Sequence, residues 1–313
     1  MSRAAATQFP SQAEQVGQRL TDLIGNTPLL RLEGVVPAGN LFAKAEWCNP
    51  GQSTKDRPAW KIIEEAERSG ALSSQKTLLD ATSGNTGIGY AMIGAARGYP
   101  VCLCMPASVT PSRIAILKAY GAELILTDPS LFSDGAILKA RELYAADPDR
   151  YFYADQYSNE NNWKAHFEQT GPEIYRQTGG QVRHFVATLG TSGTFMGAGR
   201  FLKQKNPAIQ VVEVQPDSAF HGLEGMKHME SSIVPAFYDP DFADRKAVVR
   251  TEAAYQAVVE LARTEGLLAG ISSGAALVTA REIAEKNPGE TVVTVFPDGG
   301  LKYLSERFWS DTL

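Results

Sequence analysis

Short apolar runs alternate with amphipathic stretches along most of the chain after residue 76. The apolar runs are continuous, and they predict strands at 77–81, 101–105, 123–127, 151–154, 184–189, 209–214 and 291–296. The intervening stretches have helical spacing, and they predict helices at 85–97, 111–120, 136–146, 161–177, 194–205, 252–265 and 273–285. A repeated strand–helix unit is therefore the main feature of the pattern.

Repeated units of this kind are typical of parallel sheets with helices on both faces. Strands covered on both faces are expected to be continuous apolar runs, as these are. About ten strands are expected, which is more than one twisted sheet comfortably holds, so we predict two α/β domains. The segment 215–249 breaks the pattern and contains two of the four histidines. It is predicted to be a long functional loop region.

Composition narrows the class of protein. The 313 residues are 43% hydrophobic, and 30 basic against 35 acidic residues give a net charge of −5. This composition is that of a globular protein, and it argues against a nucleic-acid partner, which usually meets a basic surface. The longest apolar stretch, 88–105, is interrupted by Arg97, Gly98 and Pro100, so no membrane span is expected.

Three cysteines are present, which is too few for a disulfide scaffold in a chain of this length. Cys102 and Cys104 fall in a predicted strand and are interpreted as small buried hydrophobic residues. The first 20 residues lack the apolar core of a signal peptide. We therefore expect a reduced, cytoplasmic protein.

Three strand-to-helix junctions are rich in glycine, serine and threonine, at 82–87, 190–194 and 270–274. The first N–H groups of a helix lack partners within the helix, and the helix dipole favours negative charge there. Glycine also lets the backbone approach an anion closely. The junctions are candidate phosphate or carboxylate sites, although serine, threonine and asparagine are also ordinary helix caps.

Several common site types do not match these junctions. None has the Gly-x-Gly-x-x-Gly or Gly-Lys-Ser/Thr pattern of nucleotide sites. The third junction fits Gly-x-Ser-x-Gly, but all four histidines precede Ser272, which disfavours a serine hydrolase of that type. The histidines also lack zinc-ligand spacing, so no metal site is predicted.

One lysine, Lys55, lies in the turn-rich segment 49–59 just before a predicted helix. A lysine shielded from water can lose its proton and form a Schiff base. The alternative from the residues alone is an ordinary solvated lysine in a turn.

Taken together, these motifs resemble the cysteine synthases, the O-acetylserine and O-phosphoserine sulfhydrylases, which are close to cystathionine β-synthase. The resemblance runs from about Leu20 to Phe308. It rests on collinear motifs at 25–29, 44–46, 49–59, 82–87, 170–174, 190–194, 270–275 and 302–305. It implies the tryptophan synthase β-like fold of type II pyridoxal-phosphate enzymes: two three-layer α/β domains with mostly parallel sheets. The smaller, mobile domain is expected at 47–158 and the larger at 1–46 plus 159–313, in a homodimer.

The resemblance implies pyridoxal 5′-phosphate as cofactor. Lys55 matches the lysine that forms the internal aldimine and later moves the substrate's α-proton. Asn85 matches the partner of the ring 3′-oxygen, and Ser272 matches the partner of the ring nitrogen. The cofactor phosphate is matched by Gly190, Thr191, Ser192, Gly193 and Thr194.

The implied substrate site grips an α-carboxylate and closes the smaller domain over it. It is matched by Thr82, Ser83, Gly84, Asn85, Thr86 and Gln156. The implied reaction is a β-replacement, in which an O-activated L-serine loses its leaving group to give an α-aminoacrylate. A sulfur donor then adds at Cβ and gives L-cysteine.

The sequence also departs from the family pattern. Asp80-Ala81 stands where Glu-Pro is usual, Gln52 stands where glycine is frequent, and the segment after Gly225 is longer and more charged. Within that segment Lys227, with His221 or His228, is a candidate to favour an anionic donor or acceptor. A solvated loop lysine is the alternative.

The sequence leaves other interpretations of the function open. A cystathionine β-synthase-like enzyme, joining serine and homocysteine, is the main alternative. A serine or threonine dehydratase fits less well, because its lysine motif differs from 55–59. A binding protein that has kept the fold is the alternative from another class. The choice between acetylserine and phosphoserine, and the sulfur source, are not decided by the sequence.

Overall fold

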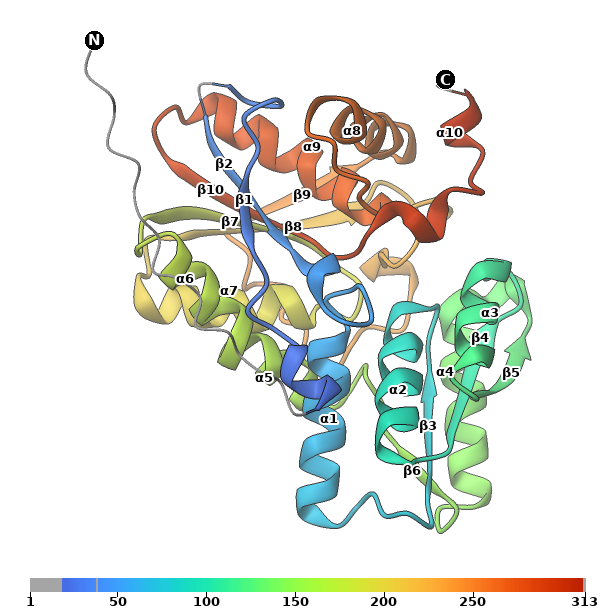
Figure 1. The fold of residues 1–313 in the computed structure, drawn as a ribbon. Coiled ribbons are helices and arrows are strands. Elements are labelled where there is room, and N and C mark those ends of the chain that lie inside the picture. Colours follow the sequence, from blue (N-terminus) through green and yellow to red (C-terminus); the bar gives the residue numbers. More distant parts are fainter. Residues whose placement is uncertain (1–18, 38, 312–313) are drawn as a thin grey trace.

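The computed structural model describes residues 19–37 and 39–311. Most of the first 20 residues, in which no signal peptide is expected, lie outside this described part. Within it, no helix combines the length and the apolar character needed to cross a membrane. The chain forms two sheets, which Figure 1 shows side by side.

The larger sheet has six strands in the order β1-β2-β10-β7-β8-β9. All neighbouring pairs are parallel except β1 and β2, which form an antiparallel hairpin. The strands are β1 (Leu29–Arg31), β2 (Asn40–Ala45), β7 (Val182–Thr188), β8 (Gln210–Pro216), β9 (Arg245–Val249) and β10 (Thr291–Phe296). Helices α8 (Thr251–Thr264) and α9 (Ile271–Lys286) pack on one face, and α7 (Gly193–Lys205) packs on the other.

The smaller sheet has four parallel strands in the order β5-β4-β3-β6. They are β3 (Thr77–Ala81), β4 (Val101–Pro106), β5 (Glu123–Thr127) and β6 (Tyr151–Tyr153). Helices α1 (Asp56–Ser69) and α2 (Asn85–Arg97) cover one face, and α4 (Phe132–Ala146) covers the other. Cys102 and Cys104 are fully buried against α4, which confirms their interpretation as core residues.

Shorter elements complete the chain. They are α3 (Pro111–Ala119), α5 (Asn161–Ala165), a π-helical turn (His166–Thr170), α6 (Gly171–Gln177), the 3₁₀ turn η6 (Gly300–Tyr303) and α10 (Phe308–Asp311). The π turn interrupts what the sequence pattern predicts as one helix over 161–177. Two three-layer α/β units with mostly parallel sheets confirm the predicted fold class. The four strands of the smaller sheet lie within 77–153. The domain bounds at 47 and 158 stay a prediction.

One prediction needs correction. The segment 215–249, expected to be a loop region, ends in the strand β9. This strand is the edge of the larger sheet, and four of its five residues are not buried. Because an edge strand covered on one side does not need a continuous apolar run, the pattern that found the central strands could not find this one.

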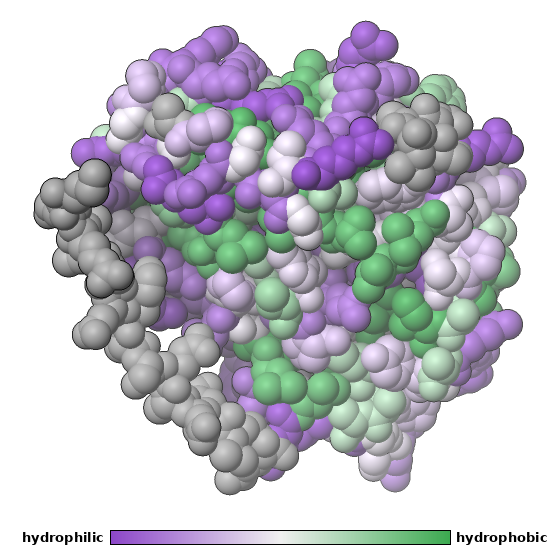
Figure 2. Space-filling view, turned by 45° about the horizontal axis from the view of Figure 1, so that its top comes forward, coloured by the Kyte–Doolittle hydropathy of each residue, from purple (hydrophilic) through white to green (hydrophobic). Residues whose placement is uncertain are grey.

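The surface is mixed in character. In Figure 2, hydrophobic side chains gather in groups across the middle of this face, between more hydrophilic margins. Large exposed hydrophobic residues in the described part of the chain include Leu23, Leu268 and Leu301.

Candidate active site

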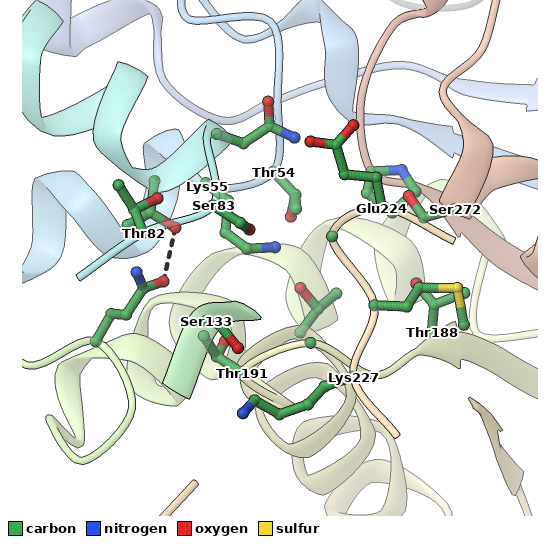
Figure 3. Close-up of a pocket in the computed structure, with 18 of the residues that line it drawn as sticks. Thr54, Lys55, Thr82, Ser83, Ser133, Thr188, Thr191, Glu224, Lys227 and Ser272 are labelled. Carbon is green, nitrogen blue, oxygen red and sulfur yellow. Dashed lines mark hydrogen bonds between the residues drawn. The ribbon is translucent and has the colours of Figure 1, made fainter. Parts of the chain in front are cut away.

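A polar cavity lies between the two sheets, at the carboxyl ends of their parallel strands (Figure 3). The end of β3 leads into the 82–86 loop, the end of β7 leads into the 190–194 turn, and β10 leads into Pro297. Ligands of open α/β sheets bind at this edge. The structure therefore brings all three glycine-rich junctions of the sequence to one place, with Ser272 at the start of α9.

Lys55 comes directly before α1 and extends its amine into this cavity. Protein surrounds the amine, and desolvation lowers its pKa below the ordinary lysine value. The charge of Lys302 lowers it further, while Asp298 and Glu46 oppose the shift. An amine that releases its proton easily can attack a carbonyl carbon or accept a proton. The structure thus places Lys55 in the cavity and not on a solvated turn.

Hydrogen bonds hold the 82–86 loop and Gln156 together. The Thr82 hydroxyl accepts from the N–H of Gly84 at 3.0 Å and from that of Gly87 at 3.2 Å. The Thr86 hydroxyl donates to Oε1 of Gln156 at 2.7 Å. The loop therefore presents fixed hydroxyl and N–H groups to the cavity, including those of Ser83, and such groups suit a carboxylate.

Asn85 is held by two residues from the segment after β10. Its Nδ2 donates to Asp298 Oδ2 at 2.8 Å, and its Oδ1 accepts from Lys302 Nζ at 2.6 Å. Asp298 also accepts from the Tyr303 hydroxyl at 2.8 Å. Sequence reasoning gave no role to Asp298. Its signal is its position two residues after β10, at the edge where the other junctions lie.

The 190–194 turn has the features of an anion site. Ser192 is in the left-handed region at φ 64°, directly before α7, and its buried hydroxyl has no hydrogen-bond partner in the described part of the chain. A Cβ at Gly190 would lie 2.5 Å from the Gly225 carbonyl oxygen, so only glycine fits there. Thr191 and Thr194 are held by Asn162 and His166.

These residues fit pyridoxal 5′-phosphate. A phosphate suits the 190–194 turn, because an unpartnered buried hydroxyl, glycine backbone and a helix N-terminus meet there. An aldehyde suits the desolvated amine of Lys55. Ser272, at the second position of α9, offers a neutral hydroxyl to the same cavity.

Lys227 lies between this cavity and a neighbouring outer cavity, and it lines both. Its side chain is 5% exposed, and Nζ is 2.7 Å from Oδ1 of Asp134. Desolvation lowers its pKa, and Asp134 opposes that shift. His221 lines only the outer cavity, whereas His228 lines neither and bonds Ser231. Of the three candidates, Lys227 alone reaches the inner cavity.

A buried charge network anchors the start of α1 behind Lys55. Arg57 donates to Glu46 at 2.7 and 2.8 Å and to Glu173 at 2.7 and 2.8 Å. Lys44 pairs with Glu173 at 2.6 Å, and Thr27 donates to Glu46 at 2.6 Å. Burial alone would raise the pKa of Glu46, but Arg57 outweighs it and lowers that pKa to about 2. Four of the collinear sequence motifs thus meet in one network.

Asp80, near the end of β3, bonds backbone N–H groups next to the 82–86 loop. Its carboxyl accepts from the N–H of Ala81 at 2.8 Å and from that of Gln156 at 3.2 Å. The group is fully buried, and desolvation raises its pKa to about 8. Between the ordinary pKa of 3.8 and about 8, the folded protein holds a proton that the unfolded chain has released. The Asp80 contribution to stability therefore falls as pH rises through this window.

We expect Asp80→Asn to remove this pH dependence. Relative to the wild type, the variant should gain up to about 1.4 kcal/mol of unfolding free energy per pH unit between pH 5 and 7. Denaturant unfolding at a series of pH values measures the difference. The exposed Asp149→Asn serves as control and should follow the wild type. Parallel pH curves for Asp80→Asn and the wild type would show that Asp80 is ionised in the fold.

Comparisons with known proteins agree with this geometry. Residues 20–298 match the family described as pyridoxal-phosphate dependent enzyme. The chain is 51% identical over 303 residues to a cysteine synthase of Aquifex aeolicus, covering 94% of this chain and 93% of that protein. It is 39% identical over 288 residues to cysteine synthase B of Pseudomonas aeruginosa, covering 91% and 95%. The crystal structure of cysteine synthase from Entamoeba histolytica superposes with a TM-score of 0.90 at 32% identity, covering 98% and 94%. The chain therefore belongs to the pyridoxal-phosphate dependent enzymes and, among them, to the cysteine synthase family.

Proposed function

We propose that this enzyme makes L-cysteine by β-replacement on an O-activated L-serine, with pyridoxal 5′-phosphate as cofactor. The observation that carries the proposal is the desolvated amine of Lys55 in a cavity that also holds the 82–86 loop and the 190–194 turn. Its membership in the cysteine synthase family supports the same reaction.

The cofactor, when bound, supplies an electron sink for negative charge that develops at the substrate's α-carbon. In our proposal the residues that hold it are Lys55, Asn85, Gly190, Thr191, Ser192, Gly193, Thr194 and Ser272. Ser272 offers a neutral hydroxyl and no carboxylate to the ring nitrogen. The ring is then a weaker sink, which favours loss of a β-substituent over transamination.

The chain's own residues bind the substrate and move its proton. Hydroxyl and N–H groups of the 82–86 loop, with Gln156, bind the α-carboxylate and fix the orientation of the α-carbon. The Nζ of Lys55 accepts the α-proton, because its lowered pKa leaves it unprotonated more readily, and it returns that proton after the sulfur atom has added.

Two assays on the purified holoenzyme test the proposal. O-acetyl-L-serine or O-phospho-L-serine with sulfide should give cysteine. L-Serine with homocysteine, the reaction of the alternative enzyme, should give cystathionine much more slowly. Faster cystathionine formation would reverse the assignment. A preparation that cannot be loaded with the cofactor would support a binding protein instead.

We further propose that Lys227 favours an anionic donor, because its buried amine borders the inner cavity. Its pairing with Asp134 limits this effect, since Asp134 neutralises part of the charge. Lys227→Met should lower kcat/KM for O-phosphoserine about tenfold relative to O-acetylserine, as expected for one lost charge-assisted contact. Asp134→Asn should change the same ratio in the opposite direction. An equal loss for both donors in Lys227→Met would remove Lys227 from donor selection.

A cytoplasmic homodimer is part of the proposal. Exposed leucines such as Leu23, Leu268 and Leu301 provide apolar surface that a second copy can cover. Sedimentation of the holoenzyme should give about twice the 33.8 kDa of one chain.

A further inference from the structure

Arg113 is a buried cation in the wall of the inner cavity that the proposed reaction does not use. It lies in α3, its side chain is 2% exposed, and it lines the cavity together with the 82–86 loop. Its Nε has no hydrogen-bond partner among the described residues. Burying a guanidinium whose N–H group has no hydrogen-bond partner costs free energy of folding. Such a group in a cavity wall therefore indicates a functional role.

The Arg113 side chain supports the substrate loop directly. A Cβ placed on Gly84 would lie 2.6 Å from both Cδ and Nε of Arg113, so the arginine packs against the loop backbone. On its other side, the guanidinium carbon lies 5.0 Å from the centre of the Tyr303 ring. The Tyr303 hydroxyl bonds Asp298, which in turn holds Asn85. The 82–86 loop is thereby supported at two of its residues.

Across the cavity, NH1 of Arg113 and a carboxylate oxygen of Glu224 form an ion pair by proximity, without the geometry of a hydrogen bond. Glu224 belongs to the segment that follows β8 of the larger sheet, and Figure 3 shows its carboxylate pointing into the cavity. The pair therefore joins the unit of the smaller sheet to the unit of the larger one at the wall of the inner cavity. Because Glu224 is 25% exposed and Arg113 is buried, the attraction is screened less than that of a surface pair.

We propose that Arg113 is a positioning residue, which the ion pair with Glu224 fixes so that the 82–86 loop stays in its carboxylate-binding arrangement. This inference rests on the proposed function of that loop. It identifies Arg113 and Glu224 as a coupled pair that determines affinity for the amino-acid substrate, while the chemical step stays with Lys55.

The test is a double-mutant cycle on the holoenzyme with Arg113→Met, Glu224→Gln and the double variant. Each single variant should raise KM for O-acetylserine about tenfold and change kcat less than about threefold, because substrate binding and not chemistry is affected. The double variant should be no worse than the poorer single variant, since both changes remove one interaction. Arg113→Lys, which keeps the charge, should recover part of the loss.

A matched control separates this effect from the general loss of an ion pair. Arg281→Met breaks the part-buried pair with Glu260 between α8 and α9, away from the cavity, and should leave KM unchanged. The proposal would be overturned if the two single-variant increases in KM multiplied in the double variant. A fall in kcat at constant KM would also overturn it. If Arg113→Met fails to fold, an unchanged KM in Glu224→Gln overturns it as well.

Failure of the proposed function would be recognised separately. A titration with L-serine, monitored through the absorbance of the bound cofactor, gives a dissociation constant that does not depend on turnover. If the wild type makes no cysteine, the proposed function fails. The double-mutant cycle, measured with the dissociation constant of L-serine in place of KM, still tests whether Arg113 and Glu224 act together.

Discussion

Replacement of Lys55 by alanine is expected to abolish cysteine formation. The variant loses the amine that holds the cofactor aldehyde and the group that moves the α-proton. Proton transfer by a positioned side chain alone contributes about 10²–10⁴-fold, so kcat should fall by at least about 10³-fold. Steady-state assays with O-acetylserine and sulfide measure the loss, and the absorbance of the purified variant should lack the signature of a covalently held cofactor.

The fold should survive this change. Desolvation already disfavours the charged form of Lys55, so removal of its amine leaves no buried charge without a partner. Lys61→Ala is the control in α1, the helix that follows Lys55, because Lys61 pairs with Glu65 and Glu168 away from the cavity. Its activity should equal that of the wild type. Substantial turnover in Lys55→Ala, with Lys61→Ala unaffected, would assign the proton transfer to another residue.

The sequence predicts the elements that depend on local patterns. The strand Thr291–Phe296 and the helix Asn85–Arg97 have the expected bounds, because a buried apolar run and a closing glycine at position 98 define them. The edge strand Arg245–Val249 was missed, since it is mostly exposed and lacks such a run. The start of α4 at Phe132 was also missed, by four residues, since Ser133 and Asp134 read as loop.

The candidate site, like the fold, could be predicted from the sequence only in part. The junctions at 82–87, 190–194 and 270–274 could be recognised because each combines glycine with a helix start. Arg113 and Glu224 could not be recognised, since 111 positions separate them in the chain and only the packing of the two units brings them together. Long-range pairs of this kind leave no spacing signal in a single sequence.

The buried network around Arg57 leads to the largest expected effect on stability. Arg57→Met leaves the Glu46 and Glu173 carboxylates without their main partner, inside the protein. Removal of one partner from a buried ion pair typically costs about 3–5 kcal/mol, because the remaining charge is desolvated and uncompensated. Lys44 still pairs with Glu173, so the greater part of the cost should arise at Glu46.

Denaturant unfolding of the apoenzyme and the holoenzyme measures this loss. The control is Arg68→Met on the same helix, whose exposed pair with Glu65 should contribute little. Adding Glu46→Gln to Arg57→Met should recover part of the stability, because it removes the stranded charge at Glu46. If Arg57→Met and Arg68→Met are equally stable, the four motifs that meet at Arg57 do not support the fold. These motifs would then need a different role, such as positioning Lys55, which precedes Arg57 by two residues.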